Sequence, residues 1–484
     1  MRLSTLALAT FACLLNVAGA AARPNIVLII ADDMGWGDVG YNGSEIQTPN
    51  LDRLAESGVR LDRFYATPAC SSTRASLMTG QSTARTGVKR AIFQTSDASL
   101  PLELRILPEF LRDAGYRTAL VGKWHLGHAR REMLPLARGF DYAYGYLTGG
   151  IGHYDHVGGG RRDWHRNEVT LREEGYATHL IADDAIRQIE HRDRDRPLFL
   201  YVAFSAPHLP NEAPADTIAR YADIEDENRR VYAAMVDEMD RAIGAILAAL
   251  EETGMTDDTL VWFMSDNGGT HRKYSRDRLS AAARMVDDSI GGPARTRLLE
   301  FMRTTTQDGG GDNGPYQGGK GTLGEGGVLV PSVVSLPGHF PPRPLSQRIT
   351  VQDILPTLTV IAGAETEPEQ PVDGADQTAL LRGLAHTAPV DYLVEDPSGA
   401  AYYMDNWKLR RPNDDSPALF DLDADPYEGR DLASDHPEIV ATMHERLAAF
   451  PRRESVHAPM RRFFLDPDEH GGEEEDEPWA DIVR

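Results

Sequence analysis

Four short apolar runs in this sequence are each followed by side chains that can bind a metal ion, hold an anion or transfer a proton. In chain order these are Asp32 and Asp33 after residues 26–31, Lys123 and His125 after residues 118–121, His208 after residues 198–204, and Asp266 and Asn267 after residues 260–264. Carboxylate and amide oxygens are hard ligands, which suit Ca²⁺ or Mg²⁺ better than Zn²⁺. The sequence therefore favours a metal site with imidazoles and an ammonium group beside it.

The runs that precede these side chains have the composition of buried parallel strands. Residues 26–31, 118–121, 198–204, 260–264 and 328–336 are apolar and rich in β-branched side chains. Helical patterns lie between them at 51–57, 107–114 and 228–253, and a glycine follows or closes each one. The alternation predicts an α/β fold with a large, mostly parallel sheet sandwiched between helices. Ligands bind such sheets beyond the carboxyl ends of the strands, so the four clusters should meet at one edge.

The pattern changes near residue 389. Short strands are predicted at 392–395, 401–404 and 408–410, and an amphipathic helix at 437–450. We interpret residues 389–466 as a smaller C-terminal α+β subdomain and residues 23–388 as the catalytic domain. Residues 467–484 form an acidic tail, which we expect to be solvated.

The charge of the chain restricts its partners. The formal net charge is -24, whereas a general nucleic-acid binder is normally basic, so we expect no nucleic-acid partner. An acidic surface also repels anionic substrates at long range. An anionic substrate would therefore need a local cluster of cations or a metal ion to hold it.

Residues 1–22 have the pattern of a signal peptide, with Arg2 at the start, an apolar run over 3–17 and small residues over 18–20. We therefore expect export to the periplasm or the medium. The apolar run is short for a membrane span, and no other segment approaches that length. Of the two cysteines, Cys13 lies in this segment, so only Cys70 would remain in the mature chain. A lone thiol in an exported protein raises the question of its chemical role.

Cys70 opens a segment that reads Cys70-Ser71-Ser72-Thr73-Arg74 and continues to Leu77-Met78-Thr79-Gly80. It resembles the signature of type I, formylglycine-dependent sulfatases, which is Cys-x-Pro-Ser/Thr-Arg followed by Leu-x-Thr-Gly. Other motifs of that family follow the same order: residues 32–38, 122–127, 206–208, 265–269, 319–321 and 325–327. The resemblance is strong over residues 24–363 and implies the fold of the alkaline phosphatase superfamily.

The resemblance implies a cofactor and a nucleophile. Calcium would be held by Asp32, Asp33, Asp266, Asn267 and the modified Cys70. Cys70 would be oxidised to formylglycine, whose hydrate attacks the sulfur of a sulfate ester. The family has proline where this chain has Ser72, and that proline helps the modifying enzyme to recognise its target. The implied partner in maturation is a formylglycine-generating or other sulfatase-maturing enzyme.

The resemblance also implies roles for the cations and imidazoles. Arg74 would hold the formylglycine oxygens, and Lys123 and Lys320 would bind sulfate oxygens. His125 would help to expel sulfate from the modified side chain. His208, with Lys320, would stabilise or protonate the leaving oxygen, where the transition state of a sulfate monoester accumulates charge.

The substrate is predicted from more variable segments. The chain resembles N-acetylgalactosamine-4-sulfatase-like enzymes most at residues 145–147, 153–154, 196–201 and 232–236, which implies a sulfated carbohydrate. Two long segments, 149–166 and 271–311, are expected to set specificity, since loops around a shared site carry it. The candidate contacts in the first are His153, Arg161, Arg162 and Trp164. The arginines could pair with a second anion, and the tryptophan could stack on a sugar.

Two other functions fit the same residues. A phosphate or phosphonate ester hydrolase on this fold would share much of the metal site, and some phosphonate hydrolases use formylglycine too. A non-catalytic, calcium-dependent glycan-binding protein would result if Cys70 stayed a thiol.

Overall fold

The computed structural model describes residues 23–94, 96–158, 161–270, 309–365, 370–384, 391–413 and 416–457. The predicted signal peptide, the acidic tail and nearly all of the 271–311 segment lie outside these ranges. Among the described residues, no helix is long and apolar enough to cross a membrane.

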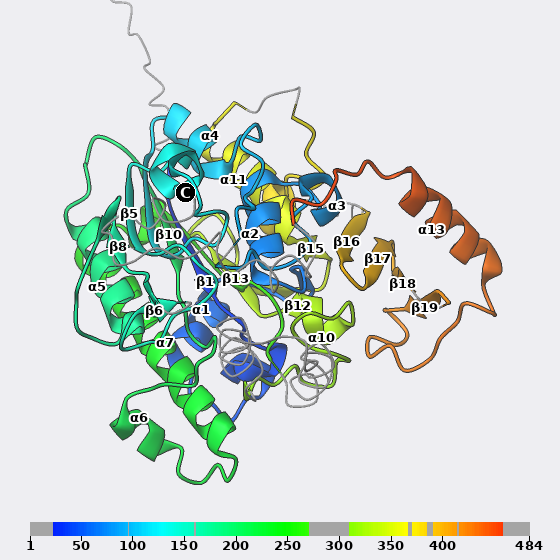
Figure 1. The fold of residues 1–484 in the computed structure, drawn as a ribbon, viewed down its shortest axis with the longest axis horizontal. Coiled ribbons are helices and arrows are strands. Elements are labelled where there is room, and N and C mark those ends of the chain that lie inside the picture. Colours follow the sequence, from blue (N-terminus) through cyan, green and yellow to red (C-terminus); the bar gives the residue numbers. More distant parts are fainter. Residues whose placement is uncertain are drawn as a thin grey trace, which may run out of the picture.

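A ten-stranded sheet forms the centre of the larger domain (Figure 1). Its strands, in spatial order, are β14 (Arg343–Leu345), β2 (Val59–Leu61), β13 (Ser332–Ser335), β11 (Thr259–Ser265), β1 (Asn25–Ala31), β10 (Leu198–Ala203), β4 (Arg117–Lys123), β5 (Tyr142–Tyr146), β8 (His165–Arg166) and β9 (Val169–Thr170). The five central strands from β11 to β5 are parallel. They are buried on both faces, which explains why their sequences are continuous apolar runs. The predicted α/β class is confirmed.

Helices cover both faces of this sheet. Alternate residues of β1 belong to two separate apolar cores, since Ile26 and Leu28 face one side and Val27 and Ile29 face the other. The first core includes α2 (Cys70–Thr79), α4 (Leu107–Asp113) and α11 (Ile354–Ala362), and the second includes α1 (Pro49–Ser57), α5 (Ala177–Glu190) and α7 (Glu227–Glu252). Figure 1 shows α5 and α7 together on one side of the sheet, away from α2 and α11. The helices predicted at 51–57, 107–114 and 228–253 are therefore present.

One predicted strand is wrong in its detail. Residues 328–336 do not form a single parallel strand: α10 (Glu325–Val328) ends there, β12 (Leu329–Val330) follows, and β13 comes after Pro331. β13 runs antiparallel to β11, and β12 pairs with β3 (Phe64–Tyr65) in a small sheet completed by β15 (Ile349–Thr350). Proline has no N–H for a strand ladder, so the chain changes sheets at Pro331.

The C-terminal subdomain has its own antiparallel sheet. Its strands are β16 (Tyr392–Asp396), β17 (Gly399–Met404), β18 (Trp407–Pro412) and β19 (Ala418–Asp421), and α13 (Pro437–Ala449) packs against it (orange to red in Figure 1). The strand β19 was not predicted from the sequence. The remaining elements are α3 (Thr83–Thr86), α6 (Ala215–Arg220), α12 (Thr378–Leu381), β6 (Val157–Gly158) and β7 (Arg161–Arg162), together with short 3₁₀ turns.

A buried charge cluster joins the two units. Lys408 on β18 is fully buried, and its Nζ lies 2.9 Å from Oε1 of Glu325 and 2.9 Å from Oε1 of Glu428. The hydroxyls of Tyr65 and Tyr403 donate to Glu325 at 2.7 and 2.9 Å. Nη1 of Arg410 also lies 3.7 Å from Oε1 of Glu428, so the carboxylate that depends most on Lys408 is that of Glu325. Removing Lys408 would leave this buried carboxylate without a counter-charge, a loss that should be costly.

Replacing Lys408 with methionine should lower the free energy of unfolding by about 3–5 kcal/mol, because buried Glu325 loses its counter-charge and Glu428 loses the nearer of its two cations. The midpoint of urea denaturation, followed by tryptophan fluorescence, measures the loss. The matched control is Arg430→Met, which removes an exposed pair with Asp435 in the same subdomain and should cost less than about 1 kcal/mol. Equal losses in the two variants would contradict this account of the junction.

Candidate active site

The polar clusters meet at the carboxyl ends of four neighbouring strands. Asp32 and Asp33 directly follow β1, and Asp266 directly follows β11. Lys123 is the last residue of β4, and β10 leads through a short loop to His208. Since β11, β1, β10 and β4 are parallel neighbours, these ends share one edge of the sheet. The predicted convergence is therefore present.

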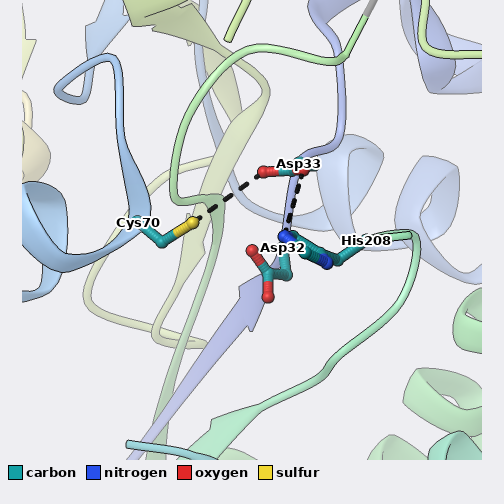
Figure 2. A group of neighbouring side chains, drawn as sticks. All are labelled: Asp32, Asp33, Cys70 and His208. Carbon is teal, nitrogen blue, oxygen red and sulfur yellow. Dashed lines mark hydrogen bonds and ion pairs between the residues drawn. The ribbon is translucent and has the colours of Figure 1, made fainter. Parts of the chain in front are cut away.

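Cys70 is the first residue of α2 and points toward this edge (Figure 2). It is almost fully buried, and its Sγ lies 4.0 Å from Oδ1 of Asp33. Burial raises the pKa of the Cys70 thiol to about 12, so the unmodified side chain is neutral at ordinary pH. A neutral thiol is a weak nucleophile. As an unmodified thiol, Cys70 is therefore a poor nucleophile in this position.

Three cations pair with three buried carboxylates around Cys70. By N-to-O distance, the pairs are Lys123 with Asp32 at 2.5 Å, Lys320 with Asp33 at 2.6 Å, and Arg74 with Asp266 at 2.8 Å. Burial alone would raise the pKa of Asp33, but the charge of Lys320 and its hydrogen bond outweigh burial and lower the pKa. Burial, followed by the charge of Asp32, raises the pKa of Asp266 to about 6. The Asp266 carboxylate is therefore less stabilised as an anion than that of Asp33.

The donor atoms of this cluster fit a hard cation. Oδ1 of Asp32 and Oδ1 of Asn267 are buried and accept no hydrogen bond from any residue that the structure describes. Ligand atoms of Asp32, Asp33, Cys70 and His208 all lie within 4.8 Å of one another. Unsatisfied buried oxygens are costly, and a bound calcium ion would satisfy them. These residues can therefore hold a metal ion.

Arg74 is fixed on the same face of α2 as Cys70, one helical turn further along. Its guanidinium is buried and donates to Oδ2 of Asp266 through Nε and Nη2 and to the carbonyl of Lys123 through Nη1. The hydroxyl of Tyr201 lies 3.4 Å from Nη1. Such multiple charge-assisted bonds restrict the side chain to one position next to the nucleophile.

Two histidines near the cluster have assignable tautomers. Nε2 of His125 lies 2.8 Å from the carbonyl of Ile92, and Nδ1 of His208 lies 2.7 Å from the carbonyl of Leu209. A carbonyl only accepts, so each of these nitrogens carries the proton and the other ring nitrogen is the acceptor. Burial lowers the pKa of both imidazoles, to about 3 for His208 with Lys320 as the next cause. Both rings are therefore neutral, with one nitrogen each able to take up a proton.

Two predicted substrate contacts are corrected. Trp164 is fully buried: its indole N–H donates to Glu173 at 3.0 Å, and its ring stacks on His156 at 4.5 Å between centroids. It is therefore a core residue, and no sugar can stack on it. His153 is also buried, and its Nε2 donates to the carbonyl of His208 at 2.9 Å. It orients the loop of His208 and does not face a substrate.

Of the remaining residues of the 149–166 segment, only some lie at the site. Arg161 and Arg162 lie on β7, which pairs with β6, and Arg162 is half-buried. At the other end of the segment, a Cβ on Gly149 would lie 2.8 Å from Nε2 of His125, and one on Gly150 would lie 2.9 Å from His208. These two glycines therefore let the chain pass directly over both imidazoles.

Several residues at the site were not predicted. The hydroxyl of Thr270 donates to Oδ2 of Asp33 at 3.3 Å, beside the predicted Asn267, which donates to Oδ1 of Asp33 at 2.8 Å. The hydroxyl of Tyr146 is buried beside the cluster without a hydrogen-bond partner in the described chain. Thr270 directly follows the 265–269 motif, which was a signal for it. Tyr146 and Tyr201 lie within strands, where nothing in the sequence separates them from core residues.

Both the sequence and the fold of this chain are similar to those of known proteins. A profile of the family described as Sulfatase matches residues 24–364. Arylsulfatase J of Mus musculus is 30% identical over 92% of this chain and 78% of its own length. N-acetylgalactosamine-6-sulfatase of Mus musculus is 34% identical over 78% of this chain and 70% of its own length. A crystal structure of Ps i-CgsB with k-i-k-neocarrahexaose superposes with a TM-score of 0.78 at 28% identity, covering 92% of this chain and 98% of that one.

The family profile spans most of the larger domain, and it includes Cys70 and every residue of the three carboxylate–cation pairs around it. The superposition on Ps i-CgsB covers 92% of this chain and therefore extends beyond the residues that the family profile matches. On both grounds the chain belongs to the sulfatase family, the hydrolases of sulfuric esters.

Proposed function

We propose that this protein hydrolyses sulfate monoesters on a sulfated carbohydrate, with Cys70 converted to formylglycine and with calcium as the metal. The observation that carries the proposal is the position of Cys70: it opens a buried helix 4.0 Å from Asp33, within three carboxylate–cation pairs. Such an arrangement can hold a cation and an anion next to one nucleophile.

The proposed metal ligands are Asp32, Asp33, Asp266, Asn267 and the modified Cys70. The unpartnered oxygens of Asp32 and Asn267 support two of them directly. When bound, calcium would polarise the nucleophile and formylglycine would supply an oxygen in place of the thiol. Oxygen in place of sulfur also suits the metal, because calcium prefers hard ligands.

The remaining roles follow from charge and position. Lys123 and Lys320 are proposed to bind the sulfate oxygens, since their ammonium groups are the cations nearest to the Asp32–Asp33 pair. Arg74 is proposed to hold the oxygens of the modified Cys70 from the same helix face. The neutral Nδ1 of His125 is suited to accept a proton. His208, with Lys320, is proposed to stabilise the leaving oxygen.

The carbohydrate part of the proposal rests on the relatives. A structure named Ps i-CgsB holds a neocarrahexaose, and two matched relatives are named as an arylsulfatase and an N-acetylgalactosamine-6-sulfatase. The rival phosphate or phosphonate hydrolase is less favoured, because the two relatives are named as sulfatases, whereas the similarity to a phosphonate monoester hydrolase of Agrobacterium radiobacter, at 22% identity and a TM-score of 0.60, shows the fold alone. Turnover of matched sulfate and phosphate monoesters separates the two reactions.

Export and maturation complete the proposal. The charged, apolar and small-residue pattern of residues 1–22 supports secretion, to the periplasm or the medium. A sulfatase-maturing enzyme is the proposed partner that oxidises Cys70. It would have to accept Ser72 at the position where the family has proline.

Replacing Cys70 with alanine should lower kcat for a sulfate ester by at least about a thousandfold, since the side chain that becomes the nucleophile is lost. Steady-state turnover of an aryl sulfate measures the effect. The thermal midpoint serves as the control for folding and should stay close to that of the parent protein. Activity above a tenth of the parent value would contradict the assignment.

Replacing Asp32 with asparagine should weaken calcium binding at least about tenfold, because a charged hard ligand is lost. Calorimetry measures the affinity. A second readout is stability: calcium at a hundred times its Kd should stabilise the parent protein by about 2.7 kcal/mol, and this gain should shrink in the variant. Asp423→Asn, at an exposed carboxylate paired with Arg63, is the matched control. Unchanged affinity in Asp32→Asn would refute this metal site.

Arg161 and Arg162 stay as proposed contacts to remote anionic groups of the substrate. Replacing both with alanine should raise KM for a sulfated oligosaccharide by about fivefold, which is the value of one or two exposed ion pairs. KM for a small aryl sulfate should be spared. Equal increases for the two substrates would place these arginines in the catalytic centre or in the folding of β6 and β7.

A further inference from the structure

A cleft of about 640 Å³ lies between the catalytic domain and the C-terminal subdomain. On one side it is lined by Lys89 and Arg90, which follow α3. On the other side lie Arg411, at the end of β18, and Arg452, after α13. None of these four cations belongs to the catalytic cluster. We call this surface the inter-domain cleft.

The inter-domain cleft carries an excess of positive charge. Its four cations face two carboxylates, Glu395 and Asp396. Glu395 is already shared, since Lys89 Nζ lies 2.7 Å from one of its oxygens and Arg452 Nε lies 2.7 Å from the other. Arg411 is exposed, and unlike its neighbour Arg410, which lies 3.7 Å from Glu428, it forms no ion pair with any residue in the described ranges. Because the chain as a whole has a net charge of -24, a local excess of positive charge in one cleft indicates a specific role for that cleft.

One short stretch of chain connects this cleft to the catalytic centre. Two residues beyond Arg90, the N–H of Ile92 donates to the hydroxyl of Ser71 at 2.9 Å, and its carbonyl accepts from His125 at 2.8 Å. Ser71 is the neighbour of Cys70. Two residues span at most about 7 Å, so the backbone at Arg90 lies roughly 18 Å or less from that at Cys70 along this path. A chain of a few sugars can cover this distance.

We propose that the inter-domain cleft binds a second anionic group, a sulfate or carboxylate, of the same glycan chain whose sulfate ester is held at Cys70. This inference rests on the proposed function and deepens it, because the substrate becomes a polyanionic oligosaccharide or polysaccharide. Guanidinium groups match the geometry of sulfate and carboxylate with paired donors. Glu395 does not oppose such a ligand, because two cations already neutralise it.

One imidazole that lines the cleft is uncharged. His457 lines it, and burial, together with Arg90, lowers the pKa of this imidazole to about 3. The ring therefore adds no charge, and the cationic character comes from the four lysine and arginine side chains alone. These remain charged at all ordinary pH values.

The test uses the unreactive Cys70→Ala protein and isothermal calorimetry. The probes are a chondroitin sulfate hexasaccharide, a carrageenan hexasaccharide and a sulfated monosaccharide. The cleft variant is Arg411→Glu, and the matched control is Arg112→Glu at an exposed arginine of α4. We expect Arg411→Glu to weaken binding of at least one hexasaccharide by about fivefold or more, and high salt to reduce the difference. Arg411→Lys should restore most of the affinity.

The monosaccharide is the internal reference, because it fills the catalytic pocket without reaching the cleft. Its affinity should be the same in Arg411→Glu and in the parent. The proposal is overturned if neither hexasaccharide binds more tightly than the monosaccharide, or if Arg411→Glu and Arg112→Glu behave alike. These outcomes are independent of turnover. A protein that hydrolyses aryl sulfates but fails this binding test keeps the proposed function and loses the second site.

Discussion

The carboxylate of Asp33 is the contact on which the site depends. It receives Lys320, Asn267 and Thr270 as donors and lies 3.7 Å from His208 and 4.0 Å from the sulfur of Cys70. A buried carboxylate must be compensated, and here the compensation comes from residues far apart in the sequence. The parallel strands are what bring them together, since each strand ends at the same edge. Charge balance around Asp33 thus links the fold to the chemistry.

The same demand for charge balance extends to the junction of the two units. Lys320 precedes α10, whose first residue, Glu325, is held by Lys408 of the C-terminal sheet. The loop of Lys320 is therefore anchored from one side by the catalytic domain and from the other by the subdomain. The C-terminal antiparallel sheet therefore holds the loop of Lys320 in place in addition to packing against the catalytic domain. The same sheet also forms one wall of the inter-domain cleft, at the Gly399 end of β17.

Much of the fold could be predicted because its central strands are buried on both faces and read as apolar runs. The site edge could be predicted because polar residues directly follow those runs. The break at Pro331 was missed because residues on either side are equally apolar, although proline was the signal. Trp164 and His153 were misassigned because a loop sequence does not tell which side chains turn inward. The ion pair between Lys408 and Glu325 joins residues that are far apart in the sequence, and no local sequence pattern predicts it.

The central claim is that Cys70 acts as an oxidised residue and not as a thiol. The most direct test is the mass of the peptide containing Cys70, taken from protein of the native host that has been shown to hydrolyse a sulfate ester. If free thiols are first alkylated, the account predicts a peptide that carries no alkyl group and is lighter than the thiol form, as the aldehyde; its hydrate has nearly the mass of the thiol but is not alkylated. A peptide found only as the alkylated thiol, in protein that retains sulfatase activity, would contradict the account.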